Sequence, residues 1–209
     1  MRGKLITLEG IDLSGKSTQA KRLFLYLKAS GRKVILLREP GGTRISEQIR
    51  RILLTGKNLG LTPQTELLLY LSARAQLVSQ IIRPALESGK IVICDRFYDS
   101  TTAYQGYGRG IKLDLIHKLN RFATGGITPH LTMLFDLPVQ SALKRATSNR
   151  IKPDRMEREG VGFHKRVRNG FLSIAKKDKK RFKVIESISD PNKTWKKVQQ
   201  SVDNYLKAK

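Results

Sequence analysis

The feature that most constrains the fold of this sequence is a glycine-bounded loop at residues 10–17, which ends in Gly-Lys-Ser. Its spacing, G-x-x-x-x-G-K-[ST], is that of a phosphate-binding loop, in which backbone N–H groups turn inward around phosphate oxygens. The lysine of such a loop reaches the terminal phosphates, and the hydroxyl group binds Mg²⁺. We therefore predict a nucleoside triphosphate site formed by Gly10, Ile11, Asp12, Leu13, Ser14, Gly15, Lys16 and Ser17, with Ser17 holding Mg²⁺.

The residues on either side place this loop between a strand and a helix. Before it, the largely apolar run of residues 5–8 is typical of a strand buried in a parallel sheet. After it, apolar residues recur at helical spacing from Ala20 to Leu27, and Gly31 supplies a stop. The positive end of the helix dipole would then lie at the anion site. The alternative is a glycine-rich turn that binds no ligand.

Four more short, apolar segments alternate with helical stretches, a pattern that predicts an α/β fold with a five-stranded parallel sheet and helices on both faces. These segments are Lys33–Arg38, Ile91–Asp95, Leu131–Leu137 and Phe182–Ile188. In such sheets, ligands bind beyond the carboxyl ends of the strands. The first three strands end in charged residues, which are Glu9, Arg38-Glu39 and Asp95-Arg96. We therefore expect the functional site at this edge.

Helical spacing recurs between the strands and after the last one. The expected helices are Ser46–Thr55, Thr62–Ser88, Lys112–Thr124, Pro138–Thr147, Val161–Lys177 and a final amphipathic helix around Trp195–Leu206. We expect Thr62 to cap the long helix and Pro84 to kink or end it. Its broad apolar stripe is typical of a core and also permits a helix-to-helix dimer contact. The polar stretch Asn149–Gly160 fits a mobile loop, and residues 1–209 are expected to form one domain.

Charge is the unusual bulk property, because 41 Lys and Arg residues oppose 17 Asp and Glu residues, a formal net charge of +24. A solvated cationic face explains the lysine-rich run Lys176–Lys183 at least as well as a nucleic-acid site, and no specific nucleic-acid partner is expected. The sequence has no apolar run of about 20 residues, and its N-terminus goes straight into a strand, which together predict a cytoplasmic protein. Cys94 has no disulfide partner, and the three histidines lack metal-ligand spacing.

A phosphate loop alone does not separate GTPase switches, ATPase motors and kinases. Transfer between two phosphorylated substrates needs positive charge on both donor and acceptor phosphates, because charge spreads over the migrating group. The arginines suited to that work are Arg50, Arg96, Arg145, Arg150 and Arg155.

Four blocks of the sequence resemble the thymidylate kinases with a bacterial-type lid, which belong to the P-loop nucleoside monophosphate kinases. The blocks are Gly10–Ala20, Arg38–Thr43, Asp95–Gly110 and Asp154–Glu159, and the resemblance covers essentially the whole chain. It implies that the γ-phosphate of ATP is transferred to dTMP, forming dTDP for dTTP synthesis and DNA replication. It also implies Mg²⁺ as a cofactor, a homodimer through the long helices and a lid at about residues 145–160.

Carried over residue by residue, the resemblance implies an acceptor site of Asp12, Glu39, Pro40, Arg50, Tyr70, Arg74, Arg96, Thr101, Tyr104 and Gln105. Arg50 and Arg96 would clamp the acceptor phosphate, and Asp12 would contact the sugar 3′-hydroxyl. Asp95 resembles the carboxylate that organises Mg²⁺ through water. Glu39-Pro40 matches a family turn that often contains a cis peptide bond.

For the base, the resemblance implies that Tyr70 stacks on thymine and Arg74 hydrogen-bonds its edge. Thr101 and Gln105 would face the same base, and Tyr104 would lie beneath the deoxyribose. From the residues alone, Tyr70 could instead belong to the core, and Arg74 could pair with a carboxylate.

Leu13 departs from the family pattern, which has glycine or arginine at this position. A leucine retains the backbone N–H group, and only left-handed or more extreme backbone angles would oppose it. Because Leu13 carries no charge, the cation that stabilises the transferring phosphate is expected from the lid, from Arg150 or Arg155. Together with Lys16, Asp95 and Arg96, these arginines are the predicted catalytic residues.

The sequence leaves three other interpretations open. A related kinase could prefer another acceptor such as dUMP, because base selectivity depends on pocket shape. The net charge of +24 motivates a nucleic-acid-binding P-loop ATPase, which DNA-stimulated ATP hydrolysis would indicate. A kinase-shaped protein without activity is the third, and the intact Lys16, Ser17, Asp95 and Arg96 argue against it.

Overall fold

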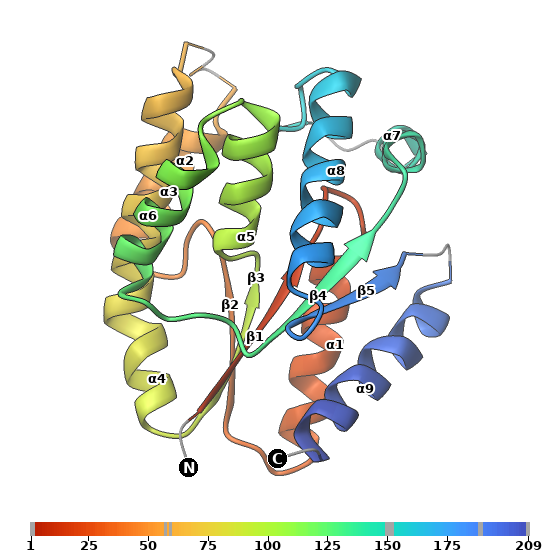
Figure 1. The fold of residues 1–209 in the computed structure, drawn as a ribbon. Coiled ribbons are helices and arrows are strands. Elements are labelled where there is room, and N and C mark those ends of the chain that lie inside the picture. Colours follow the sequence, from red (N-terminus) through yellow and green to blue (C-terminus); the bar gives the residue numbers. More distant parts are fainter. Residues whose placement is uncertain (1–2, 57, 59, 149–152, 188–189, 208–209) are drawn as a thin grey trace.

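The computed structural model describes residues 3–56, 58, 60–148, 153–187 and 190–207, and within them one parallel sheet organises the chain. Its strands are β1 (Lys4–Glu9), β2 (Val34–Arg38), β3 (Ile91–Asp95), β4 (Leu131–Asp136) and β5 (Phe182–Glu186). They lie in the order β2-β3-β1-β4-β5 (Figure 1). Every neighbouring pair is parallel, which confirms the predicted α/β fold with five parallel strands.

The sequence between the strands forms helices at nearly the predicted positions. The described helices are α1 (Lys16–Ala29), α2 (Arg44–Leu54), α3 (Pro63–Leu77), η1 (Val78–Ile82), α4 (Arg83–Glu87), α5 (Tyr98–Thr101), η2 (Thr102–Gly108), α6 (Leu113–Thr124), α7 (Val139–Ser148), α8 (Val161–Lys177) and α9 (Pro191–Lys207). None of the described helices is both long enough and apolar enough to span a membrane.

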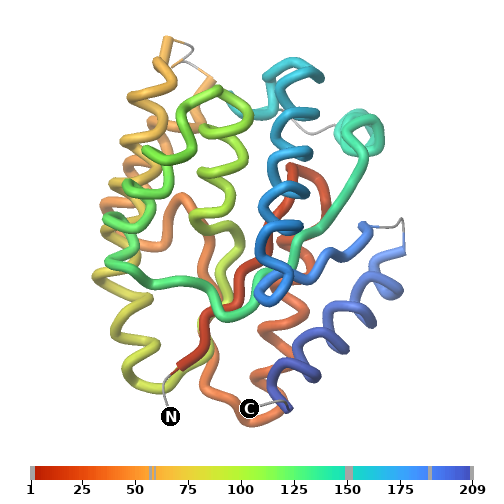
Figure 2. Tube along the Cα trace, viewed as in Figure 1, coloured from red at the N-terminus to blue at the C-terminus, as the bar shows by residue number. Residues whose placement is uncertain are grey.

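Helices cover both faces of the sheet, as predicted. On one face, α1 and α9 bury Leu23, Leu27 and Val198 against alternate strand residues such as Ile6 and Ile93. On the other face, the segment from α3 to α4 packs on β1 and β3, while α8 packs on β4 and β5 and α7 packs against α8. The tube view follows the chain as it crosses from one face to the other (Figure 2).

The long helix after Thr62 starts as predicted and changes character before Pro84. The Thr62 hydroxyl accepts a hydrogen bond from the backbone N–H of Thr65, and Pro63 is the first helical residue. The helix then passes through the π-helical segment η1 before α4 begins at Arg83. Proline has no N–H group and its ring crowds the preceding turn, which accounts for the altered hydrogen-bonding pattern there.

The segment 98–108 forms α5 and η2, to which no helix was assigned from the sequence. Its glycines argue locally against a helix, but they allow η2 to lie close to α8. A Cβ on Gly108 would come within 2.7 Å of the Phe163 ring, and one on Gly170 would come equally close to Tyr107. Close packing between two helices, which no local pattern reveals, therefore overrides the low helix propensity of glycine.

Candidate active site

The loop between β1 and α1 has the backbone shape that its glycines permit. Gly10 has φ 143°, and a Cβ at this position would lie 2.5 Å from the carbonyl oxygen of Phe135. Gly15 has φ 83° and caps α1, whose first helical residue is Lys16. The loop therefore places the N-terminus of α1 at the edge of the sheet. The free N–H groups and the positive dipole end of the helix favour binding of an anion there.

Lys16 is a buried cation at this loop. Its Nζ donates to the carbonyl oxygen of Ile11 at 3.2 Å and lies 3.7 Å from Oδ1 of Asp12. Burial lowers the pKa of the Lys16 ammonium group, and the positive charge of Arg96 lowers it further. Ser17, the next residue, is exposed on the first turn of α1. The loop thus combines a desolvated positive charge with an accessible hydroxyl group.

Asp12 ties the loop to Arg96 and Tyr104. Nη2 of Arg96 donates to Oδ1 of Asp12 at 2.5 Å, and the Tyr104 hydroxyl donates to Oδ2 at 2.9 Å. Burial alone would raise the pKa of the Asp12 carboxyl group, but Arg96 and then Lys16 hold it below its ordinary value. Arg96 also donates to the carbonyl oxygen of Gly10 and to Oγ of Ser100. Asp12 therefore stays ionised beside two cations.

Arg74 and Glu39 form a second, deeply buried ion pair. Nε and Nη2 of Arg74 each lie 2.7 Å from Oε2 of Glu39, and the Arg74 side chain is only 2% exposed. Nη1 of Arg74 also donates to the hydroxyl of Thr101 and the amide oxygen of Asn120. Burial raises the pKa of the Glu39 carboxyl group, and Arg74 opposes that rise. The Glu39-Pro40 bond is cis, as the resemblance implies.

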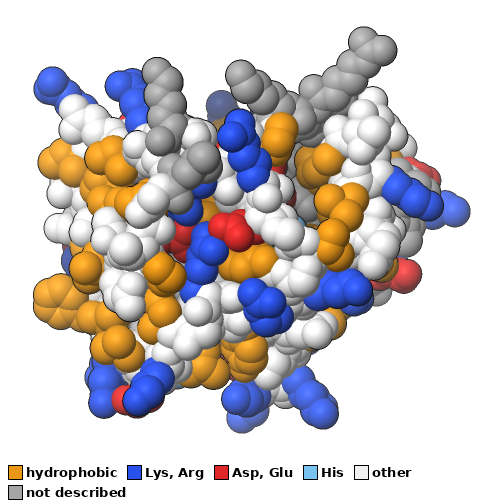
Figure 3. Space-filling model, turned by 90° about the horizontal axis from the view of Figure 1, so that it is seen from above, with side chains coloured by type: hydrophobic (Ala, Val, Ile, Leu, Met, Phe, Trp, Pro, Cys, Tyr) orange, Lys and Arg blue, Asp and Glu red, His pale blue; other side chains and the backbone are white. Residues whose placement is uncertain are grey.

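A pocket opens above these two ion pairs. All ten residues of the predicted acceptor site line it: Asp12, Glu39, Pro40, Arg50, Tyr70, Arg74, Arg96, Thr101, Tyr104 and Gln105. Seen from above, carboxylates and basic side chains meet near the middle of this face (Figure 3). Tertiary structure therefore brings together residues from the β1–α1 loop, the β2–α2 segment, α3 and the β3–η2 segment.

Four further lining residues had not been given a role from the sequence: Leu54, Ser100, Asp154 and Met156. Ser100, Asp154 and Met156 belong to the blocks that carry the resemblance, so the signal for them was present in the motifs. Leu54 ends α2 and had no such signal, because its place in the pocket depends on how α2 packs.

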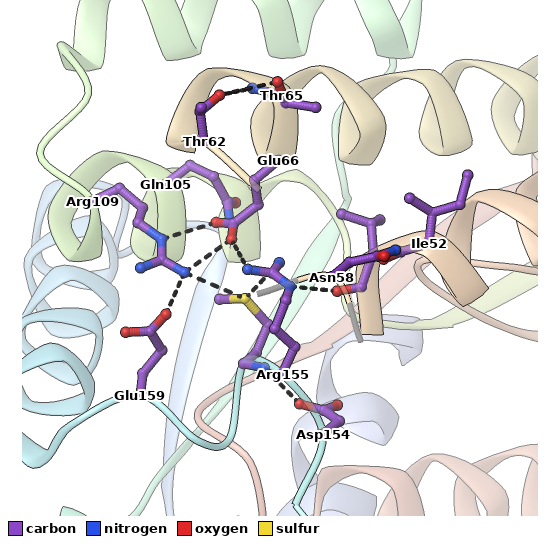
Figure 4. Close-up of polar contacts among 12 residues, drawn as sticks. Ile52, Asn58, Thr62, Thr65, Glu66, Gln105, Arg109, Asp154, Arg155 and Glu159 are labelled. Carbon is purple, nitrogen blue, oxygen red and sulfur yellow. Dashed lines mark hydrogen bonds and ion pairs between the residues drawn. The ribbon is translucent and has the colours of Figure 1, made fainter. Parts of the chain in front are cut away.

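The predicted lid arginines are placed differently from one another. Nη1 of Arg155 pairs with Glu66 at 2.7 Å, and its Nε donates to the carbonyl oxygen of Leu53 at 2.7 Å (Figure 4). Arg145 donates to the carbonyl oxygen of Leu13. Arg150 lies outside the described residues. In this arrangement the Arg155 guanidinium is engaged by α3 and α2.

Leu13 adopts the left-handed backbone conformation that would oppose a side chain. Its φ is 62°, which costs a residue other than glycine about 1 kcal/mol or more. Its side chain packs against the buried cluster that includes Val139 and Ala142. The family glycine at this position therefore has a backbone reason, and in this chain packing by Leu13 offsets part of the cost.

Asp95 fits a role near a divalent cation. It ends β3 directly beside β1, opposite Leu8, and its Oδ1 is buried without a hydrogen-bond partner among the described residues. No group of three or more His, Cys, Asp or Glu side chains in the described part of the chain could hold a metal ion by itself. Mg²⁺ at phosphate sites commonly uses one or two protein ligands together with phosphate oxygens and water. Asp95 and the hydroxyl of Ser17 suit that arrangement.

Comparisons with known proteins agree on one family. The family model described as "Thymidylate kinase" matches residues 8–200. The thymidylate kinase of Geotalea daltonii is 49% identical over 198 residues and covers 92% of both chains, and that of Chlorobium luteolum is 50% identical over 191 residues, 88% of this chain and 89% of its own. The crystal structure of thymidylate kinase from Ehrlichia chaffeensis has a TM-score of 0.78 at 37% identity, covering 97% of this chain and 99% of that one.

Proposed function

The chain belongs to the thymidylate kinase family, which uses ATP to phosphorylate dTMP to dTDP, and we propose that the pocket beside Lys16 is where this reaction occurs. The observation that carries the proposal is the convergence of all ten expected acceptor residues on one pocket next to the phosphate loop. Formation of dTDP supplies the synthesis of dTTP for DNA. The chain is therefore an ATP-dependent nucleoside monophosphate kinase.

On the donor side, residues 10–17 bind the phosphates of ATP through backbone N–H groups and the Lys16 ammonium group. Ser17 and Asp95 would hold Mg²⁺, which would supply positive charge to neutralise the phosphates. The free Oδ1 of Asp95 supports its assignment, because a buried carboxylate oxygen without a donor is stabilised by a nearby cation.

On the acceptor side, Arg50 and Arg96 clamp the phosphate of dTMP. Asp12 accepts a hydrogen bond from the sugar 3′-hydroxyl, and Tyr104 lies beneath the deoxyribose. The contacts of Arg96 with Asp12 and Gly10 support this assignment, because they hold the guanidinium between the loop and the pocket. Pre-organised charges of this kind need little rearrangement during phosphoryl transfer.

At the base end, Tyr70 stacks on thymine, Arg74 hydrogen-bonds its edge, and Thr101 and Gln105 face the same base. The sequence left two interpretations of Arg74, a contact with the base or an ion pair with a carboxylate. The two are compatible, because Arg74 lines the pocket and also pairs with Glu39. Glu39 and Pro40 form the adjacent wall.

A coupled ADP-release assay with Mg²⁺-ATP tests the function. We expect turnover that depends on dTMP and exceeds that with dUMP, dCMP and dGMP. Absence of dTMP-dependent turnover would contradict the proposal, and ATP hydrolysis stimulated by DNA without a nucleotide acceptor would favour the ATPase alternative.

The lid supplies the cation that Leu13 cannot supply. We propose that Arg150 or Arg155 stabilises the transferring phosphate, with Arg155 leaving Glu66 when ATP binds. Replacing each arginine by alanine should lower kcat for at least one variant by more than about tenfold, equivalent to roughly 1.4 kcal/mol of barrier. If both variants stay within tenfold of the wild type in steady-state kinetics, the lid assignment is wrong.

We also propose a homodimer through α2, α3 and α6, which lie together on one side of the molecule (Figure 1). Exposed large apolar side chains gather on these helices: Ile45, Ile52, Leu68, Leu115 and Phe122. Phe122 is 84% exposed and Leu68 is 56% exposed, which is unusual for side chains of this size. A cytoplasmic location and the absence of a specific nucleic-acid partner stay predictions.

The variant Leu68→Glu/Phe122→Glu should be monomeric, because two carboxylates in an apolar interface lose their hydration without gaining partners. Light scattering after size-exclusion chromatography measures the mass directly. Leu25→Glu is the control, since Leu25 is 62% exposed on α1, away from the proposed interface. A wild-type mass of one chain would contradict the dimer.

A further inference from the structure

Glu66 is a buried carboxylate to which the function described above gives no contact with either substrate. It lies on α3, one turn before Tyr70 and two turns before Arg74, and it is 1% exposed. Oε1 accepts from Nε2 of Gln105 at 2.8 Å and from Nε of Arg109 at 3.1 Å. Oε2 accepts from Nη2 of Arg109 at 2.9 Å and pairs with Nη1 of Arg155 at 2.7 Å. Four donors thus surround one carboxylate (Figure 4).

The two arginines keep this carboxylate charged. Burial alone would raise the pKa of Glu66, but hydrogen bonds from Arg109 and then Gln105, with the charge of Arg109, lower it. Arg109 is itself held in place by Glu159 at 2.6 Å and by the ring of Phe163. An ionised carboxylate has no proton to donate, so Glu66 can act only as an acceptor.

An acceptor-only neighbour decides which way the Gln105 amide points. With its NH₂ group toward Glu66, the amide makes the 2.8 Å hydrogen bond. The flipped amide would place its carbonyl oxygen against a carboxylate oxygen with no proton between them. The carbonyl oxygen is therefore turned away from Glu66, on a side chain that lines the acceptor pocket.

We propose that Glu66 is a positioning residue that sets base specificity by fixing the Gln105 amide with its oxygen available to the acceptor base. This inference rests on the proposed function of the pocket. An amide oxygen matches a ring N–H donor such as N3–H of thymine or uracil, and it opposes the unprotonated N3 of cytosine. A buried acceptor that loses its donor produces strong discrimination between otherwise similar ligands.

The variant Glu66→Gln tests this directly while keeping the size of the side chain. The arginines can only donate, so they hydrogen-bond to the amide oxygen of the new glutamine. Its NH₂ group can then face Gln105 and donate to the Gln105 amide oxygen, which turns the Gln105 amide around. We expect the ratio of kcat/KM for dTMP to that for dCMP to fall by about tenfold or more, mainly through KM. Glu159→Gln is the matched control, because Glu159 pairs with Arg109 and Gln105 donates to Glu66 instead. Its ratio should stay within about threefold of the wild type.

A second measurement uses the wild-type enzyme, so that the test does not depend on how well Glu66→Gln folds. The substrate 3-methyl-dTMP lacks the N3–H donor, and its kcat/KM should be about a hundredfold below that of dTMP. Equal use of both substrates would overturn the proposal, as would an unchanged dTMP-to-dCMP ratio in a folded Glu66→Gln variant. A wild-type enzyme without dTMP turnover would instead overturn the proposed function, and the inference with it.

Discussion

Replacing Lys16 by Met should lower kcat for dTMP phosphorylation by about 10³-fold, with little effect on stability. The migrating phosphoryl group carries negative charge on three oxygens, and Lys16 brings a buried positive charge to the loop that holds them. Methionine keeps the length of the side chain and removes the charge. Steady-state kinetics with saturating dTMP and ATP measure the effect.

The control is Lys21→Met, which removes an exposed lysine from the same helix. It should leave kcat within about twofold of the wild type, because exposed charges are screened by water. A Lys16→Met variant that keeps more than a tenth of the wild-type kcat would mean that transfer takes place without this cation.

Replacing Arg74 by Met should destabilise the protein by about 3–5 kcal/mol, because it leaves Glu39 buried without its partner. Arg74 also donates to Thr101 and Asn120, so three acceptors lose a donor at once. Urea unfolding followed by circular dichroism measures the free energy of unfolding. Arg32→Met, at an exposed arginine, is the control and should change that free energy by less than about 0.5 kcal/mol.

The penalty in Arg74→Met should shrink at acidic pH. Burial already raises the pKa of Glu39, and losing Arg74 raises it further, so the folded variant binds a proton more tightly than the unfolded chain does. Stability relative to the wild type therefore increases as pH falls toward the pKa of an unfolded glutamate. The double variant Arg74→Met/Glu39→Gln should regain part of the loss at neutral pH. If the loss in the free energy of unfolding does not vary with pH, then the unpaired Glu39 carboxylate is not its cause.

Much of the fold could be predicted from the sequence because its signals are local. Apolar runs mark the strands of a parallel sheet, and helical periodicity between them marks crossovers. The strand Ile91–Asp95 and the helix Val161–Lys177 have the predicted bounds. Prediction missed the helices at residues 98–108, where low propensity is overridden by packing on α8.

Most residues of the proposed acceptor site could be chosen from the sequence because they belong to motifs, whereas Arg50, Tyr70 and Arg74 lie outside those blocks and their place in the site came from the resemblance alone. All ten line one pocket. What no motif contains is how the site's charges are paired. Arg74 pairs with Glu39, which is 35 residues away in the sequence, and Asp12 pairs with Arg96, which is 84 residues away. The left-handed angle of Leu13 is likewise a property of the folded loop.

The phosphate loop, the alternation of strands and helices, and the charged edge of the sheet all follow from patterns in the sequence. Spacing and periodicity involve residues that lie close together in the sequence, so they can be recognised without a structure. The tertiary structure alone decided that Glu66 contacts Gln105, Arg109 and Arg155, three residues from two distant segments. Ion pairs buried at low dielectric depend on which segments the fold brings together, and that choice belongs to the packed chain as a whole.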